Sequence, residues 1–337
     1  MNLFGKNLDR DIVLIAEIGV NHEGNVETAA KLIRSSAEAG ADAVKFQSYT
    51  PKRFIAATDA ERLTRIQRFM LDEAAHRTLA KIAKDAGIVF FSSAITEDWV
   101  DLIAELSPAI KIASGDLTFE PVIRAAARTG RLLIVSTGCG TVEEIDRTVD
   151  WIADEVGREN LAGRLVLMHC VAAYPTPLAQ ANLASIPFLG ARYGVAVGWS
   201  NHVLGSDACH AAVALGARVV EVHVTDRKRD RTFRDHELSL EPPELAELAE
   251  KLPLIRASIG EYAKAPMPCE ISVRDAIRKG VTAARDLPKG TVLCADDLMY
   301  SRPASGFPAE QMRNLIGRHI KSAVVGGTSL LPAHIDR

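Results

Sequence analysis

Residues 13–47 have the sequence VLIAEIGVNHEGNVETAAKLIRSSAEAGADAVKFQ, and this stretch decides the fold. An apolar run at Val13–Glu17 is followed by a segment, Val26–Ala39, in which apolar residues recur with helical spacing. Gly40 ends that segment, and a second apolar run follows at Ala43–Gln47. Strands that alternate with helices lie parallel, because each helix returns the chain to the same end of the sheet. The stretch therefore predicts one β-α-β unit of a parallel sheet.

The same alternation continues along the chain. Eight strands are expected, at Val13–Glu17, Ala43–Gln47, Ile88–Ser92, Ala109–Ile112, Leu132–Ser136, Leu165–His169, Val195–Gly198 and Val219–His223. Eight units in about 225 residues match the count and size of a (β/α)8 barrel. A doubly wound open sheet is the competing architecture. It is disfavoured because polar residues stand at the C-terminal end of nearly every strand rather than at one crevice.

The composition is that of an ordinary globular chain. Of 337 residues, 47% are apolar and 25% are charged, which argues against a disordered or collagen-like protein. Forty basic and 43 acidic residues leave a formal net charge of −3, so the charge balance favours neither nucleic-acid nor membrane-surface binding. The longest apolar runs are of strand length, so we expect no segment that spans a bilayer.

The cysteines and the N-terminal residues indicate in which cellular compartment the protein is expected. The five cysteines are odd in number and lack CxxC spacing; they are Cys139, Cys170, Cys209, Cys269 and Cys294. Such cysteines indicate free thiols in a reducing compartment. The first eleven residues contain charges and no apolar core, so they do not resemble a secretory signal. We therefore expect a cytoplasmic protein.

The pattern changes near Arg256, where helical periodicity gives way to an irregular stretch with two prolines. Residues 1–262 are expected to form the barrel, and residues 263–277 a linker. In residues 278–337, short apolar runs are separated by turns that contain glycine and proline. This tail is expected to form a small β-rich domain.

The polar residues expected at the C-terminal mouth of the barrel suggest chemistry, because loops at that end carry the active site in such folds. They share a position at or just beyond a strand end, and they are Glu17, Asn21, His22, Lys45, Gln47, Ser92, Ser93, Lys111, Ser114, Ser136, Thr137, His169, Tyr174, Ser200, His202, Glu221 and His223. Lysines, hydroxyls, carboxylates and imidazoles at one rim indicate a reactive site.

Two of these residues, Lys45 and Lys111, stand inside apolar strands, where a lysine is rarely buried without a partner. One interpretation is that both face a shared phosphate or carboxylate. The alternative is a structural ion pair with Glu17 or Asp116. A lysine could also form a Schiff base, but two lysines among many hydroxyls favour an anionic substrate. The hydroxyls that would complete such a cradle are those of Ser93, Ser114 and Ser136.

His202 and His223 follow neighbouring strands, which a closed barrel brings together. With the carboxylates of Glu17 and Glu221 nearby, the pair is expected to bind one divalent metal. Two histidines without cysteine leave coordination positions open, which is typical of a catalytic metal. For any single histidine the alternative is a hydrogen-bonded core residue, and His169 is compatible with either interpretation.

The segment Asp226–Asp235 has the sequence DRKRDRTFRD and contains five arginine and lysine residues. It is expected to be a solvated loop, or alternatively a loop that attracts anionic substrates. Asp235, which ends this segment, and His236, which follows it, would cap the next helix or fold over the mouth.

In combination these motifs resemble those of the sialic acid synthases. The matching stretches are AEIGVNHEG (16–24), KFQ (45–47), KIASGD (111–116), STG (136–138), HC (169–170) with YPTP (174–177), GWSNH (198–202) and EVHVTD (221–226). In the tail, SRPASG (301–306) and LIGR (315–318) are similar to the C-terminal SAF, or antifreeze-like, domain of that family. The resemblance covers almost the whole chain in order.

The resemblance implies condensation of phosphoenolpyruvate with an N-acetylmannosamine-type sugar, giving a nine-carbon 2-keto acid and phosphate. It implies phosphoenolpyruvate-binding roles for Lys45, Ser93, Lys111, Ser114, Ser136 and Ser200. It implies acceptor contacts for Glu17, Gln47, Tyr174 and Asp235, and a manganese or magnesium ion on His202 and His223. Glu17 is the candidate for stabilising positive charge or activating water. The resemblance also implies a domain-swapped homodimer, in which Arg302 covers the partner's site.

Three alternatives stay open. Legionaminic or pseudaminic acid synthases, which use a diacetamido-trideoxyhexose, share these motifs. Another phosphoenolpyruvate-dependent synthase acting on a phosphorylated aldose would need a second basic site, for which the run 226–235 is available. A non-catalytic carbohydrate-binding barrel is disfavoured, because binding alone needs no metal pair facing two lysines.

Overall fold

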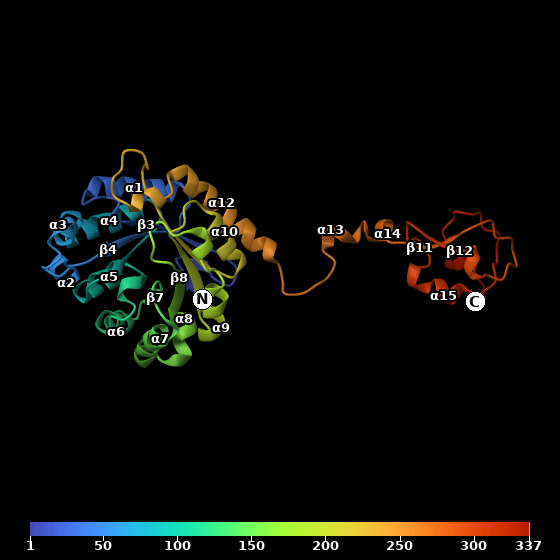
Figure 1. Cartoon of the computed structure of the whole chain (residues 1–337), viewed down its shortest axis with the longest axis horizontal. Helices are drawn as coiled ribbons and strands as arrows, with labels where there is room; N and C mark the ends of the chain where they lie inside the picture. The colour runs from blue at the N-terminus through green and yellow to red at the C-terminus, as the bar shows by residue number, and fades with distance from the viewer. Residues whose placement is uncertain (337) are drawn as a thin grey trace. The chain divides into compact units, whose positions relative to one another are not determined.

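The computed structural model describes residues 1–336, and these divide into two compact units (Figure 1). The first unit spans Met1–Gly260 and the second begins at Glu261. No helix in the described part of the chain is both long enough and apolar enough to cross a membrane.

Eight parallel strands of the first unit close into a barrel. They are β3 (Val13–Gly19), β4 (Ala43–Ser48), β5 (Val89–Ala94), β6 (Ala109–Ile112), β7 (Leu132–Ser136), β8 (Leu165–Cys170), β9 (Ala196–Asn201) and β10 (Val219–His223). The neighbours follow the chain order, and β10 closes the barrel by pairing with β3. The predicted (β/α)8 barrel is confirmed, and the doubly wound alternative is wrong because the sheet has no open edge.

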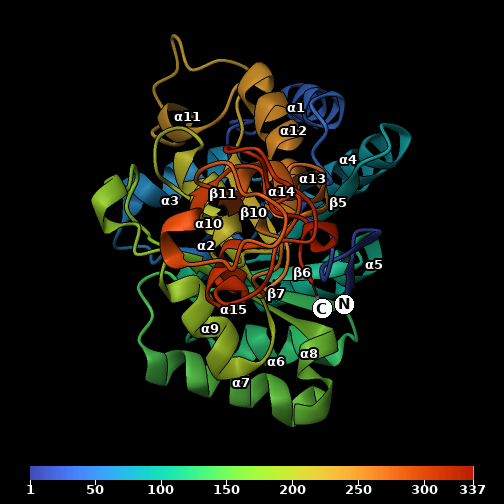
Figure 2. The ribbon, with the colours of Figure 1, turned by 90° about the vertical axis from the view of Figure 1, so that its right-hand side faces the viewer.

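The helices of the first unit surround this barrel (Figure 1). They are α1 (Val26–Glu38), α2 (Pro51–Phe54), α3 (Ala60–Phe69), α4 (Glu73–Asp85), α5 (Val100–Leu106), α6 (Glu120–Arg128), α7 (Val142–Val156), α8 (Leu161–Arg164), α9 (Ser185–Tyr193), α10 (Asp207–Ala214), α11 (Asp235–Leu238) and α12 (Pro242–Ile259). Helix α12 packs beside α1, so the last helix of the barrel meets the first (Figures 1 and 2).

Helix α1 illustrates how local sequence sets an element. Asn25 caps its N-terminus, since its side chain accepts a hydrogen bond from the Thr28 amide at 2.8 Å. The buried side of the helix is apolar, as the periodicity predicts. Gly40 has a φ of +87°, a conformation that suits glycine and ends the helix before β4.

Alternation along each strand divides the side chains into two sets. Residues that point outward, such as Leu14, Phe46 and Val220, pack under the helices in the main hydrophobic core. Inward-pointing residues in the N-terminal halves of the strands form a separate apolar cluster, which includes Val13, Phe91, Ile134, Val166 and Val219. The inward positions farther along the same strands are polar, so the barrel has an apolar lower half and a polar mouth.

A short N-terminal hairpin contributes to the inner cluster. Strands β1 (Asn2–Leu3) and β2 (Lys6–Asn7) pair antiparallel, and Leu3 and Leu8 pack into that cluster. The rings of Phe4 and Phe91 lie 5.1 Å apart. The hairpin therefore adds apolar contacts at the end of the barrel away from the polar mouth.

Several strands extend past their predicted ends. Strand β5 reaches Ala94 and β9 reaches Asn201, whereas the predictions ended at Ser92 and Gly198. The reason is that polar residues at the mouth still pair with the neighbouring strands, as Gln47 pairs in register with Ser93. A prediction that follows apolar character alone stops too early at such positions.

The region after the barrel is more helical than expected. Helix α12 continues through Arg256 to Ile259, although Pro253 lies inside it. The predicted linker 263–277 contains two short helices, α13 (Pro268–Ile271) and α14 (Arg274–Ile277).

The second unit has its own apolar cluster, which includes Val281, Leu298 and Ile320. Besides α13 and α14, its described residues form β11 (Gly280–Ala283), β12 (Leu298–Ser301) and α15 (Met312–Leu315), with further isolated bridges and 3-10 turns. Strands β11 and β12 pair antiparallel.

Close packing inside the barrel predicts a difference between two glycines. A Cβ at Gly198 would lie 2.6 Å from the carbonyl oxygen of Val219 and would also meet Met168, whereas a Cβ at Gly163 meets nothing within 4 Å. Gly198→Ala should lower the free energy of unfolding by about 1–3 kcal/mol. Gly163→Ala, in helix α8, should raise it by about 0.5–1 kcal/mol or leave it unchanged. Urea denaturation of both variants tests this, and equal stabilities would contradict the packing argument.

Candidate active site

The residues that were predicted to have a catalytic, substrate-binding or metal-binding role all line one cavity at the mouth of the barrel, except Arg302. Five other polar residues expected at the mouth do not line it, and they are Asn21, His22, Ser92, Thr137 and His169. The cavity, here called the barrel-mouth cavity, has a volume of about 1030 Å³. Small-molecule sites usually occupy about 300–1,000 Å³, so this one has room for two small substrates side by side. Its floor consists of inward-pointing strand residues, and its outer wall of loops and helix α3.

Lys45 lies at the centre of the floor. Its Nζ is 2.9 Å from Glu17 Oε2 and 3.6 Å from Glu221 Oε1, and it donates a hydrogen bond to Ser93 Oγ at 3.2 Å. Burial lowers the pKa of Lys45, but the two carboxylates outweigh burial and hold it above its usual value. The ion pair between Lys45 and Glu17, which was expected as one alternative, is therefore present. Lys45 also lines the cavity.

Lys111 has a different environment. Its ammonium donates to the hydroxyl of Ser136 and to the Ile112 carbonyl at 3.3 Å, and it forms no ion pair within 4.0 Å in residues 1–336. The expected pair with Asp116 is therefore wrong. Burial lowers the pKa of Lys111, because only 2% of the residue is exposed. A buried cation without a counter-ion beside a cavity favours an anionic ligand.

The two buried carboxylates differ in proton affinity. Burial and the neighbouring Glu221 raise the pKa of Glu17, although Lys45 opposes this. Burial also acts to raise the pKa of Glu221, but Lys111 and Lys45 outweigh it and lower the value to about 2. Ser200 donates to Glu221 Oε1 at 3.0 Å, which further favours the charged form. Glu221 therefore stays ionised, and of the two carboxylates Glu17 is the one that accepts a proton more readily.

Three serines with predicted roles lie around the lysines. Ser93 and Ser136 accept the lysine hydrogen bonds, while Ser114 accepts from the Gly138 amide at 3.1 Å. A Cβ at Gly138 would lie 2.6 Å from Cys170 Sγ and 2.8 Å from Ser114 Oγ, so only glycine fits this approach. These hydroxyls line the same cavity as both ammonium groups.

The imidazoles of His202 and His223 are neighbours, with ring centroids 5.4 Å apart. His202 Nδ1 lies 2.7 Å from the Val171 carbonyl oxygen, so Nδ1 carries the proton and Nε2 keeps its lone pair. Burial and the nearby His223 lower the pKa of His202 to about 3, which keeps it neutral. Nδ1 of His223 is buried and has no hydrogen-bond partner among the described residues 1–336. Each ring therefore has a nitrogen that is available to bind a metal.

No group of three or more histidine, cysteine or acidic side chains is arranged to hold a metal within residues 1–336. The protein would thus supply two imidazole ligands, and water or substrate oxygens the others. His169 is not part of this pair, because its Nε2 lies 2.8 Å from the Ala181 carbonyl and its ring packs on Trp199 in the helical layer.

Tyr174, Asp235 and Gln47 form the next layer above the floor. The Tyr174 ring lies 4.0 Å from that of His202, and the guanidinium of Arg234 lies 4.6 Å above it. Gln47 donates to Glu17 Oε1 at 3.2 Å, and Asp235 is buried at the N-terminus of α11. Amide, phenol and carboxylate groups at one level are suited to binding sugar hydroxyls and amides.

Arg302 belongs to the second unit, where it is exposed after β12. It does not line the barrel-mouth cavity of the first unit. Its role over a partner's site stays a prediction.

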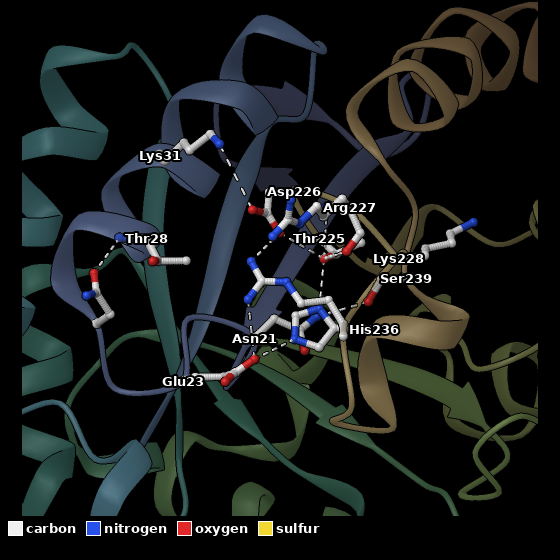
Figure 3. Close-up of polar contacts among 12 residues, drawn as sticks. Asn21, Glu23, Thr28, Lys31, Thr225, Asp226, Arg227, Lys228, His236 and Ser239 are labelled. Carbon is white, nitrogen blue, oxygen red and sulfur yellow. Dashed lines mark hydrogen bonds and ion pairs between the residues drawn. The ribbon is translucent and has the colours of Figure 1, made fainter.

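The loop that carries Asp235 is tied down by a polar network (Figure 3). Arg231 donates to Asp226 Oδ1 at 2.6 Å and lies 3.5 Å from Glu23 Oε1. His236 contacts Glu23 Oε1 at 3.2 Å through Nε2 and Thr225 Oγ1 at 2.7 Å through Nδ1. These contacts join the loop to the segment after β3, so the charged run is ordered by its own ion pairs.

Sequence reasoning left some cavity residues outside its predicted site. Glu221 was expected at the mouth and near the two histidines but was given no role of its own, yet its position two residues before His223 places it on the same inward face. Asp116 also lines the cavity, and burial raises its pKa to about 7, although Lys111 opposes this. Arg62 and Arg65 come from helix α3, and no sequence signal showed that this helix would reach the mouth.

The chain is similar in sequence to two known families and to several known proteins. The sequence matches the NeuB family over residues 32–264 and the SAF domain over residues 278–336. It is 36% identical to an uncharacterized protein of Methanocaldococcus jannaschii, over 92% of this chain and 90% of that one. It is 34% identical to N,N'-diacetyllegionaminic acid synthase of Campylobacter jejuni, over 91% of this chain and 95% of that one.

Two further relatives carry related names. N-acetylneuraminate-9-phosphate synthase of Homo sapiens is 31% identical, over 96% of this chain and 92% of that one. The crystal structure of N-acetylneuraminic acid (sialic acid) synthetase from Leptospira borgpetersenii, in complex with citrate, aligns with a TM-score of 0.74. It is 29% identical, and the alignment covers 79% of this chain and 92% of that chain.

The different surroundings of the two lysines predict opposite effects on stability. Lys45→Met leaves Glu17 and Glu221 buried without their cation and should lower the free energy of unfolding by about 3–5 kcal/mol. Lys111→Met removes a buried charge that has no carboxylate partner in residues 1–336. This change should lower the free energy of unfolding by less than about 1 kcal/mol, or should raise it. Urea denaturation at neutral pH measures both, and Lys111→Met being the more damaging change would contradict the assigned pairing.

Proposed function

The chain belongs to the NeuB family, whose named members are synthases, and we propose that it condenses phosphoenolpyruvate with an N-acetylmannosamine-type sugar. The products would be a nine-carbon 2-keto acid and inorganic phosphate. The enzyme is a transferase that ends in a SAF domain.

The observation that carries this proposal is the buried ammonium of Lys111, which lacks a carboxylate partner in residues 1–336 and lies at the floor of a cavity. A small dianionic or trianionic substrate supplies the missing charge. Phosphoenolpyruvate has both a carboxylate and a phosphate, and Lys45 and Lys111 can serve the two groups. Ser93, Ser114, Ser136 and Ser200 add hydroxyl contacts around it.

The residues present also fit a divalent metal, Mn²⁺ or Mg²⁺. The imidazoles of His202 and His223 would hold it, since the first has its proton fixed on Nδ1 and the second has a buried nitrogen without a hydrogen-bond partner in residues 1–336. When bound, such an ion supplies Lewis acidity toward the carbonyl oxygen of the open-chain acceptor.

The chain's own residues account for the remaining steps. Carbon 3 of phosphoenolpyruvate forms a bond to the acceptor's aldehyde carbon, and positive character develops at carbon 2. Glu17 would lie beside this position, where its carboxylate would stabilise the cation and take one proton of the water that adds there. That proton then goes to the alkoxide formed from the aldehyde. The tetrahedral intermediate loses phosphate as its carbon–oxygen bond breaks, and the proton of its hydroxyl group leaves with the phosphate as the keto group forms. Lys45 and Lys111 neutralise the anions throughout.

Gln47, Tyr174 and Asp235 would contact the acceptor, because they form the layer directly above the floor. A diacetamido-trideoxyhexose, as in legionaminic or pseudaminic acid synthesis, is the second candidate acceptor. The apolar side chains in the cavity wall favour it, since Ile66, Phe69 and Phe233 can pack against methyl groups.

We also propose that the active form is a homodimer in the cytoplasm. The first residues of the second unit expose apolar side chains, among them Tyr262, Met267 and Ile271, which a second copy would cover. In a domain-swapped dimer Arg302 would reach the partner's site. The five free cysteines suit a reducing compartment.

The metal assignment predicts loss of turnover without loss of fold. His202→Ala and His223→Ala should each lower the rate of phosphate release from phosphoenolpyruvate at least about 100-fold in the presence of manganese, because the acceptor loses its activating ion. The exposed His319 provides a matched control, and His319→Ala should be fully active. Circular dichroism checks the fold. Retained activity in either site variant, or activity that survives a chelator, would contradict the assignment.

The dimer predicts a role for the tail. Arg302→Ala should raise the KM for the acceptor about tenfold, since a charge-assisted contact is lost. Arg313→Ala, an exposed arginine in the same unit, should have no effect. Light scattering should give twice the mass of the chain. A monomer that is fully active would exclude the swapped arrangement.

A further inference from the structure

The segment 226–235 follows β10, ends at the first residue of α11, and is held to the rest of the first unit near its start. Arg231 binds Asp226 and lies 3.5 Å from Glu23, and Lys228 pairs with Glu244 at 2.8 Å. These ion pairs neutralise much of the basic charge that makes this run conspicuous in the sequence. They do not involve the end of the segment, where Asp235 lines the barrel-mouth cavity.

Arg234 holds that end. Its guanidinium carbon lies 4.6 Å from the centroid of the Tyr174 ring, and its Nε donates a hydrogen bond to Asp235 Oδ1 at 3.1 Å. A cation placed over an aromatic face at this distance is attracted to the π electrons of the ring. One side chain therefore contacts two residues that are positioned by different strands, since Tyr174 follows β8 and Asp235 follows β10.

The orientation of the Asp235 carboxylate depends on this contact. The Asp235 side chain is 8% exposed, whereas that of Arg234 is 66% exposed. Within residues 1–336, Arg234 is the one hydrogen-bond donor to this carboxylate. Ser239 holds the backbone of Asp235 instead, because its hydroxyl donates to the Asp235 carbonyl oxygen at 2.6 Å. The position of the Arg234 guanidinium therefore decides where the carboxylate points.

Tyr174 connects the same contact to the floor of the cavity. The centroid of its ring lies 4.0 Å from that of His202 and 6.0 Å from that of His223. Burial raises the pKa of Tyr174, so its hydroxyl stays protonated. Arg234, Tyr174 and His202 thus form a continuous series of contacts from the loop to the two histidines.

We propose that Arg234 is a positioning residue for the acceptor, because it bridges Tyr174 and Asp235 and fixes the separation of their phenol and carboxylate groups. This inference rests on the proposed function, in which both residues contact the acceptor sugar. Both partners of the guanidinium belong to the protein, so Arg234 acts through them rather than as a binding group of its own. Lys45 and Lys111 have separate partners at the floor, so Arg234 has no role toward phosphoenolpyruvate.

Steady-state kinetics test this role, with N-acetylmannosamine or the diacetamido-trideoxyhexose as the acceptor, whichever is turned over. Arg234→Gln should raise the KM for the acceptor about fivefold, because the cation is removed from the Tyr174 ring. The KM for phosphoenolpyruvate and kcat should stay within about twofold of the wild-type values. Arg234→Lys keeps a cation but loses the fork that makes both contacts, so it should raise the acceptor KM by less.

Arg229→Gln is the matched control. Arg229 lies in the same segment, its side chain is 91% exposed, and it does not line the cavity. This variant should have the same KM for both substrates as the wild type.

A double-mutant cycle shows whether Arg234 acts through Tyr174. Tyr174→Leu alone should raise the acceptor KM at least as much as Arg234→Gln does. The double variant should raise it by less than the product of the two single effects, since both changes remove the same contact. Effects that multiply, an unchanged acceptor KM in Arg234→Gln, or an equal rise in the KM for phosphoenolpyruvate would overturn the positioning role but leave the condensation intact.

A measurement without turnover covers the case in which no acceptor leads to consumption of phosphoenolpyruvate, an outcome that would overturn the proposed function. Chymotrypsin cleaves after phenylalanine, and Phe233 directly precedes Arg234. Tyr174→Leu leaves this cleavage site unchanged but releases the end of the segment, so cleavage there should be at least about threefold faster than in the wild type. Arg229→Gln should be cleaved at the wild-type rate. Equal rates in Tyr174→Leu and the wild type would overturn the bridge.

Discussion

Four buried charges at the centre of the barrel set the conditions for the rest of the site. Glu17, Lys45, Lys111 and Glu221 are each at most 4% exposed, so water does little to stabilise them. The two carboxylates hold Lys45, whereas the partners of Lys111 within residues 1–336 are a hydroxyl and a carbonyl group. Buried charges are stable only if the surrounding structure keeps their ion pairs and hydrogen bonds in place. In this group the charge of Lys111 is left for a ligand to balance.

The barrel maintains that geometry through the alternation of its strands. On β3, for example, Val13 and Ile15 point inward into the apolar cluster, and Glu17 follows at the next inward position. The same order applies to Ala109 and Lys111 on β6. The apolar lower half of the barrel and its charged mouth therefore come from one periodic pattern along the strands. The packed lower half excludes water from the side of the charges that faces away from the mouth.

The cavity changes in character from its floor to its outer wall. The buried charges of the floor, Glu17, Lys45, Lys111 and Glu221, all belong to strands of the closed barrel. The outer wall is built from α3 and from the loop before α11, which is held to the segment after β3 by Glu23, Arg231 and His236. This division would allow the proposed reaction to take place at the floor while the wall sets the preference for the acceptor.

The fold and the floor of the site could be predicted from the sequence, because both depend on local periodicity. Strand–helix alternation gives the barrel, and barrel closure brings Lys45, Lys111, His202 and His223 to one rim. The prediction of side-chain partners failed where contacts between residues far apart in the sequence determine them. Lys111 was expected to pair with Asp116 as one alternative, but the strand register directs its ammonium to Ser136 instead.

By itself, the sequence determined the barrel, the polar mouth and the resemblance to a family, since each follows from residue types at fixed spacing along the chain. Only the tertiary structure decided which charges are paired. The basic run 226–235 is conspicuous in the sequence, yet its ion pairs neutralise much of it, while Arg62 and Arg65 were not singled out and face the cavity unpaired. The physical reason is that ion pairing depends on distances across the fold, and residues hundreds of positions apart, such as Glu23 and Arg231, set those distances.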